Sequence, residues 1–271
     1  MVGRTSEKKL QKAKAEIFEL EEFIKTEITK LENKATLSTK YDKQKDKHIV
    51  YVDSVPNFDE IVLSISVIAG GILHYLRSSL DNLVFDLSNY NTNGLIQNPR
   101  NIQFPIVDSI PSNGLQGIAE IGDNQKNIID KFQPYHGVSG RPDSYFGNYI
   151  HQLSLLREYS NSDKHRTMIK ISFNPNKFEL YNNASKICLL HNEYINKNPV
   201  EYWEKYKLPK MNIGDILYEF KVEGLVIDNT EFAGYATANI SIAEYGPLIP
   251  TLKRIHSYVE LIVKNLMTSL E

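Results

Sequence analysis

The feature that most constrains this chain is a long run of apolar residues at helical spacing. From Asn57 to about Asn89, apolar side chains recur every three or four residues, which is the period of one helix face. At about 1.5 Å per residue, such a helix is roughly 50 Å long. Other helices must cover its apolar face, so the spacing predicts a helix bundle. The recurring positions are Phe58, Ile61, Ile65, Ile68, Ile72, Leu76, Leu80, Leu83 and Leu87.

Two further segments, one near each end of the chain, repeat this helical period. The first covers residues 6–34, with Ser6 as its expected N-cap, and the last covers residues 247–270 after a proline-containing start. The charged side of the first helix suits either a coiled coil with another chain or a bundle within one chain. We favour the bundle.

The long central helix carries two local signals. Asn57, followed three residues later by Glu60, predicts a capping box at its start. Gly70 and Gly71 lie in its middle and have no Cβ atoms, so they predict either a kink or the close approach of another helix.

The other segments predict shorter elements. Helices are expected at about 115–132 and 145–161, and a short strand is expected at His48–Asp53. Between residues 167 and 245, apolar and polar residues alternate, which is typical of half-buried antiparallel strands.

Together these elements predict an α+β fold in a single domain, residues 1–271. Residues 6–166 would form the core of a long-helix bundle that includes the short strand. Residues 167–245 would form a small antiparallel sheet inserted into that bundle. The helix at 247–270 would then complete the bundle.

Composition excludes several classes of protein. With 41% apolar residues over 271 residues, the chain can bury a large core, so overall disorder is not expected. A net charge of -2 gives no global electrostatic reason to bind nucleic acid, which leaves only a local patch. The longest apolar run, Ile61–Ala69, is interrupted by serines and is far shorter than a membrane span, so no membrane is expected as a partner.

Cofactors and location follow from motifs that the sequence lacks. A single cysteine, Cys188, excludes an internal disulfide framework, and together with the absence of a signal peptide it predicts a cytoplasmic protein. There is no Gly-rich phosphate-binding loop after a strand, so we expect no nucleotide cofactor and no other cofactor.

Two short stretches concentrate the unusual polar residues. In HYLRSSLDN, the side chains of His74, Arg77 and Asp81 share one helix face, and Asn82 lies beside them. The second stretch, NSDKHR, follows the apolar face of the helix at 145–161, so the two stretches are expected to meet in a groove between helices. Its candidate residues are Asn161, Asp163, Lys164, His165 and Arg166.

Four stretches, LRSSLDNLVFDL, QFPI, KFQPY and LLREYSNSDKHR, resemble a widespread bacterial family of uncharacterised proteins. The resemblance covers about residues 45–170. The first motif of such relatives is similar to the Arg/His signature of HEPN domains, which are helical domains that usually dimerise and often cleave RNA without a metal. Arg77 matches the arginine of that signature, whereas Asn82 stands at the histidine position.

The resemblance implies a HEPN-like, homodimeric protein that binds or cleaves RNA in a toxin or antiphage system. Cleavage needs an acid–base group for the 2′-hydroxyl and a cation for the phosphate. Arg77 would stabilise the phosphate, His165 or His74 would be the acid–base group, and Asp81 would orient a partner. The residues expected to bind substrate are Asn82, Asn161, Asp163, Lys164 and Arg166.

Two other interpretations use the same residues. In the first, a non-enzymatic interaction or ligand-sensing module, the motifs form a structural network and Arg77 pairs with Asp81 along the helix. The second is a metal site built from the His and Asp side chains, but no ligand-type spacing supports it and we predict no metal.

Overall fold

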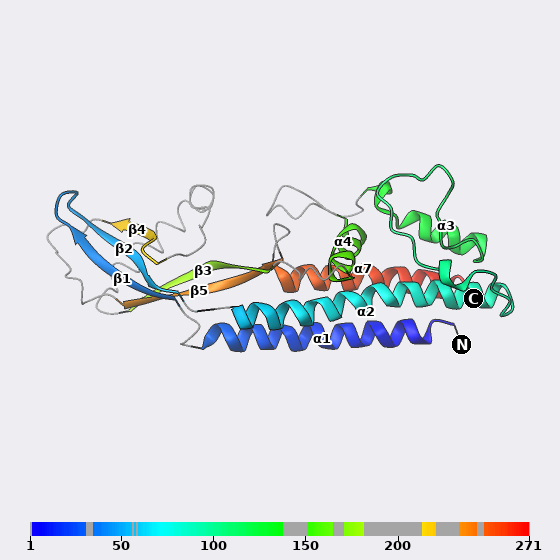
Figure 1. Ribbon diagram of the computed structural model, residues 1–271, viewed down its shortest axis with the longest axis horizontal. Coiled ribbons are helices and arrows are strands. Elements are labelled where there is room, and N and C mark those ends of the chain that lie inside the picture. The colour runs from blue at the N-terminus through cyan, green and yellow to red at the C-terminus, as the bar shows by residue number, and fades with distance from the viewer. Residues whose placement is uncertain are drawn as a thin grey trace. The chain divides into compact units, whose positions relative to one another are not determined.

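Three long helices dominate the computed structural model (Figure 1). They are α1 (Arg4–Thr29), α2 (Asp59–Asn91) and α7 (Leu248–Thr268). Their packing confirms the predicted α+β class, with α7 packed against the bundle through residues such as His256, which contacts Leu10 of α1. The structure describes residues 2–30, 35–55, 57, 59–137, 151–164, 171–181, 213–220, 233–242 and 247–270.

The chain forms two compact units. The helical unit consists of Met1–Phe23, Leu63–Ile171 and Ile242–Glu271, and the sheet unit consists of Ile24–Val62 and Ser172–Ser241. The prediction of a single domain stays a prediction.

The apolar stripes predicted from the sequence form the core of the helical unit. Burying them removes apolar surface from water, which is the main favourable contribution to folding. The stripes of all three helices contain residues that are fully or almost fully buried. They are Leu10, Ala13, Ile17 and Leu20 of α1, Ile65, Ile72, Leu76, Leu80 and Leu83 of α2, and Leu252, Ile255, Val259, Ile262 and Leu266 of α7.

The starts of the two N-terminal helices differ in how well the sequence predicted them. Ser6 is not the N-cap of α1, because the helix begins at Arg4 and Ser6 lies within its first turn. Its buried hydroxyl is hydrogen-bonded to that of Ser79 on α2, at 2.7 Å. At the start of α2, the Asn57 side chain accepts a hydrogen bond from the Asp59 N–H at 2.9 Å, which confirms Asn57 as a capping residue.

The glycine pair does not interrupt α2, which is continuous from Asp59 to Asn91. A Cβ atom placed on Gly71 would lie 3.6 Å from the Oε2 atom of Glu16 on α1. Gly71 therefore faces a side chain of α1, and 3.6 Å is an ordinary van der Waals separation that leaves room for a methyl group.

Shorter helices follow α2. They are η2 (Pro99–Asn101), α3 (Asp123–Lys131), η3 (Pro134–His136) and α4 (Gln152–Lys164). The helix predicted at 115–132 begins only at Asp123, because Gly114 and Gly117 have positive φ angles of 69° and 84° and form turns. The first part of the helix predicted at 145–161 lies outside the described residues.

The sheet unit contains β1 (Ala35–Asp42), β2 (Lys47–Ser54), β3 (Ile171–Tyr181), β4 (Ile216–Phe220) and β5 (Ala233–Ile242), in the order β3-β5-β1-β2-β4. The strand predicted at 48–53 is β2, which is paired antiparallel with both β1 and β4. We did not predict β1, because its sequence, ATLSTKYD, is too polar to resemble a buried strand.

Among the described helices, α2 is long and apolar enough to cross a membrane, with a mean hydropathy of 1.5 over an 18-residue window. A helix buried among other helices meets the same criterion, because apolar residues must cover more than one of its faces. The prediction that the chain has no membrane partner stays a prediction.

The space at Gly71 predicts that Gly71→Ala raises the free energy of unfolding by about 0.5–1 kcal/mol, because alanine is the better helix former and no neighbour must move. Urea denaturation measures this change. Gly3→Ala is the matched control and should be destabilising, since Gly3 has a φ of 79° and its Cβ would lie 2.3 Å from the Met267 sulfur. A loss of stability in Gly71→Ala would contradict the α1–α2 contact described above.

Candidate functional site

An extended segment, residues 102–108, lies at the centre of the candidate site. It is neither helix nor strand, so its backbone groups must find partners other than a neighbouring strand. Two α2 side chains supply the first pair of partners. The Phe104 N–H donates to Asp81 Oδ1 at 2.9 Å, and Arg77 Nη2 donates to the Phe104 carbonyl at 2.7 Å. Because Arg77 Nη2 is also 2.9 Å from Asp81 Oδ1, the ion pair holds both polar groups of one residue.

The buried amide of Gln133, which precedes η3, holds the next residues of the extended segment. Its Nε2 donates to the Pro105 carbonyl at 2.9 Å, and its Oε1 accepts from the Val107 N–H at 3.1 Å. Gln133 is fully buried, so loss of this amide would leave backbone groups unpaired in the protein interior.

Helix α4 anchors the end of the extended segment. Arg157 donates to the Ile106 carbonyl at 3.2 Å and forms an ion pair with Asp108. The Ser154 hydroxyl donates to Asp108 at 2.6 Å. The hydrogen bonds from Ser154 and Arg157 hold the pKa of the Asp108 carboxyl below its ordinary value, so this carboxylate stays ionised.

A cavity of about 270 Å³ lies beside the extended segment, and we call it the Arg77–Arg157 cavity. Guanidinium groups from α2 and α4 line it, and no carboxylate is among its described lining residues. The lining residues are Arg77, Gln103, Phe104, Pro105, Ile106, Val107, Pro111, Gly114, Gln116, Arg157, Ser160 and Asn161.

Both guanidinium groups retain donors for a ligand. Arg77 uses Nε and Nη2 for Asp81 and Phe104, and Arg157 uses Nη1 and Nη2 for Ile106 and Asp108. Within the described part of the chain, Nη1 of Arg77 and Nε of Arg157 have no hydrogen-bond partner. Each arginine that lines the cavity therefore has an unused cationic donor, a group that suits the oxygens of a phosphate or carboxylate.

The structure brings two of the predicted residues together. Arg77 of the first motif and Asn161 of the second line the same cavity. Asp81 is hydrogen-bonded to Arg77, and Asn82 is half-buried beside it. His74 is not brought to the cavity: its side chain is exposed and its ring lies 6.3 Å from that of Tyr75.

The other predicted residues cannot be placed in the site. His165 and Arg166 lie outside the described residues, as does Cys188. Asp163 and Lys164 lie in the last turn of α4, but their side chains are outside the described set. The expectation that Arg77 and His165 act on one phosphate therefore stays a prediction.

Four residues of the site were not predicted from the sequence: Arg157, Gln133, Gln103 and Gln116. A partial signal existed for Arg157, which precedes Asn161 by four residues and therefore shares its helix face. For Gln133 there was none, because its role depends on Pro105 and Val107, which are distant in the sequence.

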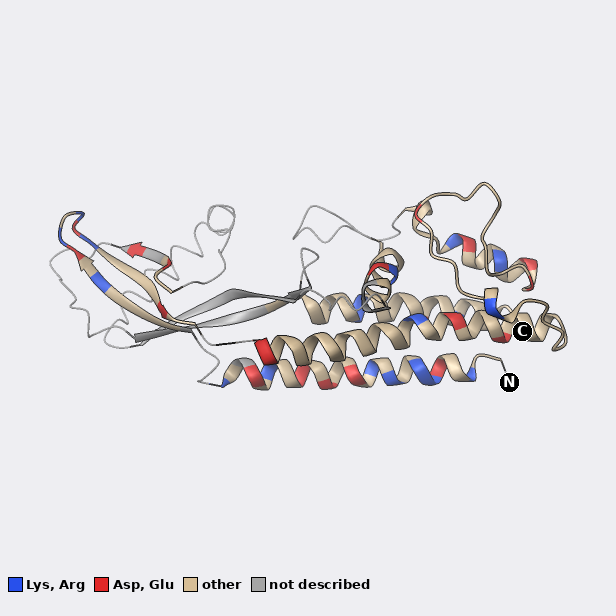
Figure 2. Cartoon of the chain, in the orientation of Figure 1, with Lys and Arg blue, Asp and Glu red and all other residues tan. Residues whose placement is uncertain are grey.

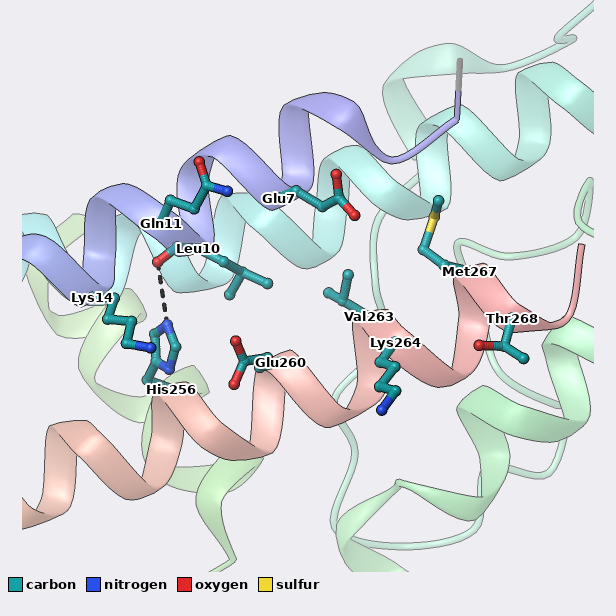
Figure 3. A pocket seen from close by; sticks show the side chains of 10 residues that line it. All are labelled: Glu7, Leu10, Gln11, Lys14, His256, Glu260, Val263, Lys264, Met267 and Thr268. Carbon is teal, nitrogen blue, oxygen red and sulfur yellow. Dashed lines mark hydrogen bonds between the residues drawn. The ribbon is translucent and has the colours of Figure 1, made fainter.

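A second cavity, of about 650 Å³, lies between α1 and α7 (Figure 3). Its walls carry two carboxylates, Glu7 and Glu260, and two ammonium groups, Lys14 and Lys264. His256 lies at one end and donates to the Leu10 carbonyl at 3.2 Å. This mixture of charges gives no preference for an anion. No group of three or more metal-ligating side chains is present among the residues that the structure describes.

No protein-family model, curated protein or solved structure matches this chain. The resemblance to HEPN domains and the expected homodimer therefore stay predictions.

The start of α4 depends on a buried histidine. His151 Nδ1 accepts a hydrogen bond from the Leu153 N–H at 3.2 Å, so its Nε2 carries the proton and donates to the Tyr258 hydroxyl at 3.0 Å. Burial lowers the pKa of His151, and the Asp108 carboxylate offsets part of this effect. The neutral imidazole thus caps the helix that carries Arg157.

Removing the Asp81 carboxylate should destabilise the protein. Asp81→Ala leaves the Phe104 N–H without its partner, and we expect the free energy of unfolding to fall by about 1–3 kcal/mol. Asp123→Ala is the control, because the Asp123 side chain is 94% exposed. Equal stability of the two variants in urea denaturation would contradict the stabilising role of the hydrogen bond between Asp81 and the Phe104 N–H.

The histidine cap predicts that stability depends on pH. Because the pKa of His151 is lowered in the folded protein, the unfolded chain binds its proton at higher pH. The free energy of unfolding should fall as the pH drops through about 6.5, and the fall is complete below the folded-state pKa. His151→Asn keeps a good capping residue without a titrating group, so its pH dependence should be weaker than that of the wild type. Identical curves for the two proteins would exclude this role.

Proposed function

We propose that this protein binds RNA by taking one phosphate group into the Arg77–Arg157 cavity. The observation that carries the proposal is the pair of guanidinium groups, presented by two different helices to a cavity with no carboxylate among its described lining residues. Guanidinium groups donate hydrogen bonds in a fork that matches phosphate oxygens. The Asn161 amide adds a neutral donor at the same cavity.

The charge distribution supports a small contact rather than a long one. Figure 2 shows Lys and Arg mainly in the first half of α1 and mainly acidic residues in its second half, so the basic stretch of this helix is short. The net charge of -2 agrees with that pattern. We therefore infer that few phosphates are neutralised on binding, which makes the affinity only weakly dependent on salt.

Placing a negative charge in the cavity tests this proposal. We expect Asn161→Asp to weaken the binding of single-stranded RNA about tenfold or more, because two unit charges about 4 Å apart near a protein surface repel by roughly 1–4 kcal/mol. Asn161 is exposed, so the fold should be retained. Fluorescence anisotropy at several salt concentrations measures the affinity.

Asn93→Asp is the matched control for this experiment. It makes the same change of charge at an exposed turn with a φ of 55°, a conformation that both Asn and Asp adopt readily. Asn93 is not among the residues lining the cavity. Equal weakening in both variants, or no binding of RNA by the wild type, would contradict the proposal.

The position of Asn161 favours one second function, metal-independent RNA cleavage. Asn161 lines the cavity and precedes His165 by four residues, so an acid–base group follows closely along the chain. Incubation of RNA with the protein in the presence of EDTA tests this function. Cleavage that is lost in His165→Ala supports an enzyme, whereas intact RNA supports a protein that only binds RNA. Arg77→Ala is a weaker test, because Arg77 also supports the extended segment.

The main alternative is a non-enzymatic ligand-sensing module in which the polar motifs are structural. The hydrogen bonds of Arg77 and Asp81 to Phe104 favour such a role for these two residues. That role is compatible with binding, because Arg77 lines the cavity as well as holding the segment.

A further inference from the structure

The amide of one exposed side chain that lines the Arg77–Arg157 cavity, Gln116, is oriented by two backbone carbonyls. The Gln116 Nε2 donates to the carbonyl oxygens of Asn113, at 3.0 Å, and of Gly114, at 3.2 Å. Carbonyl oxygens only accept hydrogen bonds, so the nitrogen of this amide must face them. Its Oε1 is then the atom left to interact with a ligand, and it can only accept.

The backbone around Gln116 keeps this acceptor in place. Gly117 has a φ of 84°, and a Cβ on it would lie 2.6 Å from the Gln103 carbonyl, so only glycine allows the loop to approach the extended segment this closely. The Gln103 N–H donates to the Gly117 carbonyl at 3.2 Å. Gln103 directly precedes Phe104, which Arg77 and Asp81 hold. The acceptor and the Arg77 guanidinium are thus tied to the same short piece of backbone.

The rest of the cavity has both apolar and polar lining. Pro105, Ile106, Val107 and Pro111 give apolar lining, and the Gln103 and Asn161 amides give polar lining. A volume of about 270 Å³ lies just below the roughly 300–1,000 Å³ of typical ligand pockets, so there is space for no more than one nucleotide.

We propose that the cavity accepts a single unpaired nucleotide and selects a base with an amino group at C6 of a purine or C4 of a pyrimidine, that is, adenine or cytosine. The amino group would donate to Gln116 Oε1 while a phosphate contacts Arg77 and Arg157. This inference rests on the proposed RNA binding. In the same register, uracil and guanine present a carbonyl oxygen at the equivalent position, which would place two acceptors face to face. Their ring N–H donors would meet Gln116 Oε1 only if the base shifted along its edge.

Uridine octamers that carry one adenosine, cytidine or inosine at the centre test this selectivity. Inosine differs from adenosine in having a carbonyl in place of the amino group and an N–H in place of the bare nitrogen at N1, so the comparison changes the ligand and leaves the protein intact. We expect the adenosine and cytidine octamers to bind about tenfold more tightly than the inosine and all-uridine octamers, since one well-placed base contact discriminates by this order.

Gln116→Met removes the acceptor. The adenosine, cytidine and inosine octamers should then bind this variant with the same affinity as the all-uridine octamer. Gln97→Met is the matched control, because Gln97 is exposed and does not line the cavity, and it should keep the selectivity.

Equal binding of adenosine and inosine octamers by the wild type would overturn the base selectivity while leaving RNA binding intact. Tighter binding of inosine would also overturn it. Failure of the wild type to bind any octamer would instead overturn the proposed function.

Discussion

The helical unit depends on how an extended piece of backbone, residues 102–108, satisfies its polar groups. A buried N–H or C=O without a partner costs about 1–3 kcal/mol, so several such groups cannot stay unpaired in a protein of marginal stability. In this segment, side chains supply the hydrogen-bond partners that a neighbouring strand supplies in a sheet. Asp81 and Arg77 from α2 both hold Phe104, Gln133 from the turn before η3 holds Pro105, and Arg157 from α4 holds Ile106. The segment therefore fixes the positions of elements that are far apart in sequence.

This arrangement explains why the two polar motifs have both a structural and a binding interpretation. Arg77 has five donor hydrogens, and its contacts with Asp81 and Phe104 leave Nη1 without a partner in the described structure. The same holds for Nε of Arg157. One guanidinium can thus support the backbone and contact a ligand. Loss of binding in a variant of either arginine must be separated from loss of the fold, which is why Asn161 is the better position for a test.

The sequence predicted the long helices well, because a three-four apolar period is a local signal that packing then satisfies. It failed where the deciding contacts are distant. Strand β1 is polar in sequence and is stabilised by pairing with β2 and β5. The helix expected from residue 115 begins only at Asp123, because Gly114 and Gly117 form turns. The motifs indicated Arg77 and Asn161, but nothing local indicated Gln133, whose partners Pro105 and Val107 are distant in the sequence.

The electrostatics of the cavity are compatible with the proposed binding of a phosphate by a chain of net charge -2. Each guanidinium is paired with a carboxylate, Asp81 or Asp108, that does not line the cavity. The pairs are nearly neutral at long range, so they attract RNA only weakly from a distance. At short range both arginine side chains line the cavity, while the carboxylates are engaged with Phe104 and Ser154. Selectivity must then come from contact geometry rather than from net charge, and contact geometry is also what a fixed acceptor such as Gln116 needs to distinguish an amino group from a carbonyl.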